Sequence, residues 1–90
     1  MSIQVHIPTP LRQHTDGKET VEAQGSTVAE VLEQVGQQYA AITDRLFDDG
    51  KVRRFVNIYV NDEDVRYLDD LNTPVKDGDS ISIIPAVAGG

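Results

Sequence analysis

The residues best suited to chemistry close the sequence, which ends with Pro85, Ala86, Val87, Ala88, Gly89 and Gly90. Glycine has no Cβ, so a carboxylate on Gly90 can pass along a narrow channel that any side chain would block. The five residues after Pro85 reach roughly 17 Å when extended. We therefore expect Gly90 to be the reacting residue, delivered into a partner enzyme by a slim tail of Ala86, Val87, Ala88 and Gly89.

Few other residues offer chemistry. The sequence has no Cys, which excludes disulfides, thiol catalysis and cysteine-based zinc sites. His6 and His14 have no partner at ligand spacing, and Asp77-Gly78-Asp79 lacks the spacing of a calcium loop and is typical of a hairpin turn. No Ser/His/Asp arrangement and no glycine-rich phosphate loop is present. We therefore expect a protein that is not an enzyme and that has no metal site.

Composition limits the classes of partner. Ninety residues with 39% hydrophobic and 26% charged side chains indicate one globular domain. The net charge of −7 argues against nucleic-acid binding, which needs clustered Lys and Arg. The scattered acidic residues serve solubility or, alternatively, steer the chain toward a basic protein surface. The sequence has no membrane-length apolar run and no basic-then-apolar leader, so we expect a cytoplasmic protein with no membrane contact.

Hydrophobic spacing predicts the first elements that must position the tail. Apolar and polar residues alternate over residues 3–7, which predicts a half-buried strand. Residues 9–17 read as a loop that ends in an Asp16-Gly17 turn. Alternation over residues 20–24 then predicts a second strand, antiparallel to the first.

A helix is the clearest element of the sequence. Thr27 followed by Glu30 is a capping-box pattern, which satisfies free amides of the first turn. Gly36 weakens the last turns by about 1 kcal/mol relative to Ala, so packing against a sheet must hold this helix. Residues 40–47 predict a short second helical turn, closed by Asp48-Asp49-Gly50. The apolar stripe of the main helix has helical spacing and consists of Val28, Val31, Leu32, Val35 and Tyr39.

The rest of the chain predicts the remaining strands of a sheet. Residues 55–60 form a dense apolar strand, and Asn61-Asp62 begins a tight turn into a short strand over 64–67. Residues 68–75 read as an irregular connection around a proline. After the Asp-Gly turn noted above, residues 80–84 predict the last strand. The order of elements indicates an α+β domain in which a sheet packs on one main helix.

The chain resembles the MoaD/ThiS family of ubiquitin-like sulfur carriers over essentially its whole length. The residues that carry the resemblance are the Asp77-Gly78-Asp79 turn, the strand over 81–84 and the tail over 85–90. The stretches IPTPLRQHT (7–15), RFVNIYVNDEDVR (54–66) and PAVAGG (85–90) are most similar to the branch of the family that serves cysteine biosynthesis. The resemblance implies a β-grasp domain over residues 1–85, with a mixed sheet of four or five strands, and a flexible tail over 86–90.

The resemblance also implies a carrier cycle. An E1-like enzyme uses ATP to adenylate the carboxylate of Gly90, and a sulfur donor then displaces AMP to leave a thiocarboxylate. In the cysteine pathway, a cysteine synthase that depends on pyridoxal phosphate accepts the sulfur, and a zinc-dependent isopeptidase releases the cysteine. The ATP, pyridoxal phosphate and zinc would belong to these partners, so the resemblance implies no cofactor in this chain.

Other destinations stay open at this point. The same terminal chemistry serves carriers for molybdopterin, thiamine and tRNA thiolation, and the tail alone does not discriminate among them. A ubiquitin-like modifier would join Gly90 to a lysine of a target protein through an isopeptide bond. A β-grasp interaction module with an inert tail is a further alternative.

The face of the sheet away from the helix is a candidate docking surface. If Val56, Ile58 and Val60 pack under the helix, Phe55 and Tyr59 face outward, and Ile84 joins them. Exposed aromatic and aliphatic side chains together indicate an interaction patch. The alternative is that loops cover them. We expect Phe55, Tyr59 and Ile84 to help bind the activating enzyme.

Overall fold

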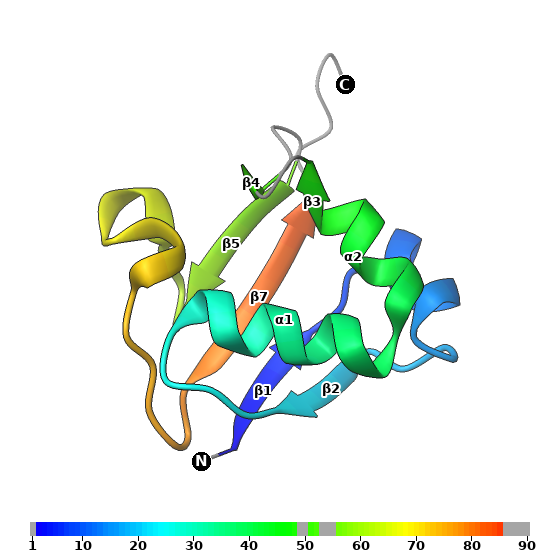
Figure 1. Cartoon of the computed structure of the whole chain (residues 1–90), viewed down its shortest axis with the longest axis horizontal. Helices are drawn as coiled ribbons and strands as arrows, with labels where there is room; N and C mark the ends of the chain where they lie inside the picture. Colours follow the sequence, from blue (N-terminus) through cyan, green and yellow to red (C-terminus); the bar gives the residue numbers. More distant parts are fainter. Residues whose placement is uncertain (1, 49–50, 53–55, 86–90) are drawn as a thin grey trace.

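A five-stranded mixed sheet forms the centre of the molecule (Figure 1). The computed structural model describes residues 2–48, 51–52 and 56–85. In the order β2-β1-β7-β5-β6, β1 and β7 are parallel and the other neighbours are antiparallel, so β7 is the middle strand. The strands are β1 (Ile3–His6), β2 (Thr20–Ala23), β5 (Val56–Val60), β6 (Glu63–Asp64) and β7 (Ser80–Pro85).

The alternation of side chains decides which face of the sheet is buried. In β1, Ile3 and Val5 are fully buried, whereas Gln4 and His6 are exposed. The register places Val5 opposite Ile81 of β7, so the apolar residues of the two strands share one face. The strands predicted over residues 3–7, 20–24, 55–60 and 80–84 are thereby confirmed in the described part of the chain.

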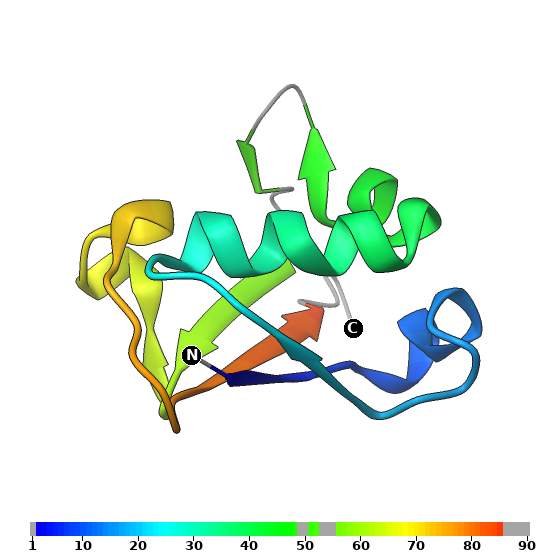
Figure 2. The same ribbon diagram turned by 60° about the horizontal axis from the view of Figure 1, so that its bottom comes forward.

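Helix α1 (Val28–Gln38) crosses the apolar face of the sheet (Figure 2). Thr27 is its N-cap, and the Oγ1 of Thr27 accepts a hydrogen bond from the Glu30 N–H at 3.3 Å. The Glu30 carboxylate does not close the expected capping box, because it accepts from the Ser26 N–H and the Ser26 hydroxyl, each at 3.0 Å. These two hydrogen bonds lower the pKa of Glu30. The helix start is therefore secured one residue earlier than the sequence pattern predicts.

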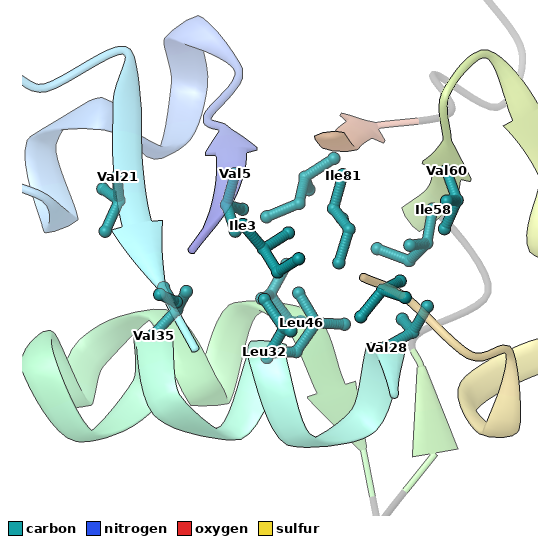
Figure 3. Packing of buried hydrophobic residues seen from close by; sticks show 14 of the residues in the cluster. Ile3, Val5, Val21, Val28, Leu32, Val35, Leu46, Ile58, Val60 and Ile81 are labelled. Carbon is teal, nitrogen blue, oxygen red and sulfur yellow. The ribbon is translucent and has the colours of Figure 1, made fainter. Parts of the chain in front are cut away.

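The core lies between α1 and the sheet (Figure 3). The predicted stripe of α1 is buried at Val28, Val31, Leu32 and Val35, and Tyr39 is half-buried at the C-cap. In Figure 3, Val28, Leu32 and Val35 of α1 point toward labelled side chains of β1, β2, β5 and β7. This packing, rather than helix propensity, holds the valine-rich helix in place. The strand residues of the core are Ile3, Val5, Val21, Ala23, Ile58, Val60, Ile81 and Ile83.

A second helix, α2 (Ala40–Leu46), follows α1 as the sequence predicts. A Cβ on Gly36 would lie 2.1 Å from the Thr43 Oγ1, so glycine is what allows α2 to approach α1 this closely. The strands β3 (Phe47–Asp48) and β4 (Lys51–Val52) then pair as a small antiparallel hairpin. The sequence analysis did not anticipate this hairpin, since two-residue strands leave no hydrophobic period.

Three short 3-10 helices replace parts of the expected loops and strands. The predicted loop over residues 9–17 contains η1 (Thr9–His14) and does end in a turn, with Asp16 and Gly17 both at positive φ. The predicted strand over residues 64–67 was wrong beyond Asp64. Its remaining residues form η2 (Val65–Tyr67), because the Asp64 carboxylate accepts the Arg66 N–H and starts a helical turn. Helix η3 (Asp70–Asn72) lies in the irregular connection.

The arrangement of a mixed sheet with one main helix across a single face is the ubiquitin-like β-grasp fold, as predicted. Among the described residues, no helix has both the length and the apolar character needed to cross a membrane.

Candidate functional site

Strand β7 is the element that leads to the tail. It pairs with β1 on one side and β5 on the other. On the face toward the core, its side chains Ile81 and Ile83 are buried. Its last residue, Pro85, lies opposite Val56, and the proline has no N–H to continue the ladder. The expected reactive residue and tail, Gly90 with Ala86, Val87, Ala88 and Gly89, lie outside the described residues. The assignments made to them stay predictions.

The predicted docking patch lies in part on the outer face of β5 and β7. Tyr59 is half-buried, and Ile84 is 43% exposed. Asn57 is opposite Ile84 and Tyr59 is opposite Ser82, so Tyr59 and Ile84 are diagonal neighbours on one face. That face is opposite the one on which Ile58 and Val60 meet the core. Phe55, the third predicted member, lies outside the described residues.

The rest of the outer face is polar. Gln4, His6 and Thr20 are exposed there, and the His6 Nδ1 lies 3.4 Å from the Thr20 Oγ1. Ile84 and the ring of Tyr59 are thus apolar groups in hydrophilic surroundings. Such a composition suits a partner that buries a few anchors within a polar rim.

The edge of the sheet beside Tyr59 carries a tight ion pair. Asp64 is buried, and its Oδ2 lies 2.7 Å from the Nη2 of Arg66, whose Nε also donates to this carboxylate. The hydrogen bonds from the Arg66 side chain and from its N–H lower the pKa of Asp64. The same contacts raise the pKa of Arg66. The ion pair and the hydrogen bond from the Arg66 N–H together fix the start of η2 beside β5.

The turn before β7 is fixed by a second carboxylate. Asp79 accepts hydrogen bonds from the Lys76 N–H at 2.9 Å and from the Asn61 Nδ2 at 3.1 Å. These hydrogen bonds, the Lys76 N–H first, lower the pKa of Asp79. The Asn61 Oδ1 accepts from the Ser80 N–H at 3.0 Å. Because the predicted Asn61-Asp62 and Asp77-Gly78 turns are tied together, the start of β7 is held rigidly.

The described part of the chain has a groove but no group of ligands for a metal. The groove, of about 400 Å³, lies on the helix side of the molecule, away from Tyr59 and Ile84. No group of three or more His, Asp or Glu side chains among the described residues could hold a metal ion. The residues that line the groove are Ala29, Glu33, Gly36, Gln37, Thr43, Phe47 and Leu71.

Two exposed apolar residues, Tyr67 and Leu68, were not predicted from the sequence as surface residues. Tyr67 is 86% exposed and Leu68 is 40% exposed, and both lie in the connection between β6 and β7. The sequence assigned this connection no surface role. The position of Tyr67-Leu68 directly before the acidic Asp69-Asp70 was the sequence feature that could have indicated exposure. Spacing alone does not tell whether such an apolar pair is buried.

Comparison with known proteins places this geometry in a family. The chain matches the ThiS family over residues 5–90. It is 52% identical to the sulfur carrier protein CysO of Mycobacterium tuberculosis, with all of both chains covered. It is also 40% identical to small archaeal modifier protein 3 of Haloferax volcanii, over 72% of this chain and 71% of that protein.

Solved structures agree with the sequence comparison. A chain in the crystal structure of the BexX/CysO complex of Amycolatopsis orientalis superposes with a TM-score of 0.92 at 52% identity. The match covers 98% of this chain and 99% of that one. Since sequence and structure agree over nearly the whole length, the chain belongs to the ThiS family of ubiquitin-like proteins.

Proposed function

We propose that this protein is a sulfur carrier for cysteine biosynthesis, with Gly90 as the residue that carries the sulfur. The observation that carries the proposal is the end-to-end identity of 52% with proteins named sulfur carrier protein CysO. The Gly89-Gly90 end of the sequence is compatible with it, because a terminal glycine gives a partner enzyme unhindered access to the carboxylate.

The chemistry proceeds in two substitutions. A carboxylate oxygen of Gly90 attacks the α-phosphorus of ATP and pyrophosphate leaves, which gives an acyl adenylate. A sulfur nucleophile then attacks the acyl carbon and AMP leaves, so one carboxylate oxygen is replaced by sulfur. The adenylate is needed because a carboxylate is a poor electrophile until AMP becomes its leaving group. The E1-like enzyme that catalyses these steps would supply the ATP site.

In this scheme the chain is a substrate rather than an enzyme. The sheet holds β7 in a fixed direction, and Pro85 is the last of its described residues to pair. Phe55, Tyr59 and Ile84 would dock the partner, while the tail enters its active site. Pyridoxal phosphate would belong to a cysteine synthase that accepts the sulfur, and zinc to an isopeptidase that releases the cysteine.

Mass spectrometry tests the proposal. The full chain is incubated with an E1-like enzyme from the same organism, ATP and a sulfur source. We expect a mass gain equal to the exchange of one oxygen for sulfur, located at Gly90. Addition of the cysteine synthase and its amino acid substrate should then give a cysteine adduct at the same residue. A chain that stays unmodified with its own enzyme would refute the carrier function.

Substitutions on the outer face test the docking role. Tyr59→Ala and Ile84→Ala should raise the KM for the carrier in adenylation and leave kcat unchanged, since neither residue reaches the carboxylate. Phe55→Ala is tested alongside them. Thr20→Ala is the matched control, because Thr20 lies on the same face in the edge strand β2. Equal KM values for all four variants and the wild type would exclude this surface.

A second candidate function is protein modification. It is favoured by the 40% identity to a protein named small archaeal modifier protein 3. A modifier would form isopeptide adducts that survive reducing agents and map to lysines of target proteins. Such adducts, found without a thiocarboxylate form of the chain, would favour this function over sulfur transfer.

A further inference from the structure

The connection between β6 and β7 presents two apolar side chains to solvent. We define the 65–72 loop as η2, η3 and the two residues between them. Within it, Tyr67 is 86% exposed and Leu68 is 40% exposed. Together with Ile84, they are the exposed large apolar side chains among the described residues. Tyrosine is one of the residue types most often found as an energetic anchor in protein interfaces.

The loop holds these side chains out because both of its ends are fixed. Val65 and Thr73, on either side of the exposed pair, are buried. The Leu68 N–H donates to the Val65 carbonyl at 2.9 Å, and the Asp69 N–H donates to the Thr73 Oγ1 at 3.0 Å. The Thr73 carbonyl accepts from the Val28 N–H at the start of α1, at 3.0 Å. An anchor held in this way loses little conformational entropy when a partner binds it.

The surroundings of the loop are acidic. Residues 61–79 contain seven Asp or Glu and two Lys or Arg, a net charge of −5 within a chain total of −7. Asp62, Glu63, Asp69 and Asp70 are exposed. Arg66 does not offset them freely, because its guanidinium is paired with Asp64. A surface of this kind complements an apolar pocket whose rim carries Lys and Arg.

The loop lies beyond the β6 edge of the sheet and packs on the helix side, where η3 contacts α1 (Figure 2). β6 lies two strands from β7, roughly 10 Å away, and Tyr59, on the strand β5 between them, is opposite Asp64, the residue directly before the loop. Arg66, within the loop, is held against β6 by its ion pair with Asp64. One partner of ordinary interface size, about 800 Å² per side, can therefore contact both Ile84 and the 65–72 loop.

We propose that Tyr67 and Leu68 anchor the carrier in an apolar, basic-rimmed pocket of the enzyme that adenylates Gly90. The inference rests on the proposed function. Among the partners, the adenylating enzyme is chosen because the carboxylate must be activated whichever pathway later receives the sulfur. The anchors act on binding and not on the reaction, since they lie at the sheet edge while the tail leaves from β7.

The test uses the full chain and the purified adenylating enzyme of the same organism. In titration calorimetry, Tyr67→Ala/Leu68→Ala should raise the Kd about tenfold, a typical effect of losing an interface anchor. The KM for the carrier should rise in parallel and kcat should stay unchanged. Tyr67→Phe/Leu68→Met, which keeps the apolar volume, should restore binding. A photo-crosslinking amino acid at position 67 should join the carrier to the enzyme, a result that does not depend on a truncating variant.

A charge series adds a second arm. Asp69→Asn/Asp70→Asn should weaken binding at low salt and reduce its dependence on ionic strength. Asn is chosen because Asp70 has a positive φ of 51°, which Asn tolerates. Asp16→Asn/Glu33→Gln removes two charges elsewhere and should leave the Kd unchanged.

Two results would overturn the proposal. One is a Kd for the alanine double variant within twofold of wild type. The other is self-association of the wild type, by sedimentation, that the same variant abolishes, since a second copy would then occupy the surface. Failure of the carrier function itself is recognised separately, because the wild type would then bind no adenylating enzyme and gain no sulfur.

Discussion

At the scale of single residues, the buried carboxylate of Asp64 governs the edge of the sheet. It ends β6, caps η2 and pairs with Arg66 in one place. The pair is asymmetric, because the Asp64 side chain is 6% exposed and that of Arg66 is 62% exposed. Removal of Arg66 therefore leaves a buried charge, whereas the solvated guanidinium itself contributes little.

Arg66→Ala should destabilise the fold modestly at neutral pH, because the buried Asp64 carboxylate loses the guanidinium and keeps only the hydrogen bond from the backbone N–H of residue 66. Because Arg66 lowers the pKa of Asp64, the stabilisation is complete above the ordinary Asp pKa of 3.8 and is lost as the pH falls through the lowered value. The difference in free energy of unfolding between wild type and variant should therefore shrink in acid. Urea titrations at a series of pH values measure it. Lys18→Ala removes an exposed charge elsewhere as a control, and identical curves for the two variants would contradict the assignment.

At the scale of elements, the contact between α1 and α2 determines where the hairpin and the groove lie. Gly36 is buried in α1, and Thr43 of α2 faces it. The sequence marks Gly36 only as a weak point in a helix. The structure shows that glycine there makes room for the neighbouring helix.

Gly36→Ala should destabilise the protein even though Ala favours helix, since its Cβ would lie 2.1 Å from the Thr43 Oγ1. In the Thr43→Ala background the obstacle is gone, because the Thr43 Cβ is 3.5 Å away. There the same change should stabilise by up to about 1 kcal/mol, the helix propensity of Ala over Gly. Thermal unfolding of the four proteins gives the coupling as a double-mutant cycle. Additive effects would show that the two helices do not meet at these residues.

The sequence predicted the elements that have a strong period or a strong turn signal. The strands β1, β2, β5 and β7, the two α-helices and the turns at Asn61-Asp62 and Asp77-Gly78 are of this kind. It failed where the decision rests on single hydrogen bonds, as at Asp64, which turns a predicted strand into η2. The exposure of Tyr67 could not be predicted from the sequence either, because composition does not tell whether a tyrosine faces the core or solvent. For the site, the sequence placed Tyr59 and Ile84 on one face, and their role in docking stays a prediction.

At the scale of the whole molecule, the described part of the core is built from the sheet and its helices. Among the described residues, the core cluster runs from Ile3 to Ile83, and the pairing of β7 is described as far as Pro85. The charge is also unevenly placed, with most of the net negative charge in residues 61–79, beside the sheet edge. A partner that recognises the folded body would therefore meet most of this charge at one edge of the sheet.

Deletion of Gly89 and Gly90 should leave the melting temperature within about 1 °C of wild type, since glycine has no side chain to bury in a core. The same deletion should abolish loading with sulfur by the adenylating enzyme. Differential scanning calorimetry and mass spectrometry on the same preparation measure both. A melting temperature that falls by several degrees would mean that the last residues belong to the fold.

The central position of β7 has a mechanical consequence. A pull on the C-terminal end of β7 acts along the strand, and ladders to β1 and to β5 share the load. Both ladders are loaded in shear, so many hydrogen bonds must break together instead of one after another. If a partner enzyme binds and releases the last residues, the force that it exerts on β7 is resisted by both ladders. The folded domain can therefore bind a partner and dissociate from it many times without unfolding.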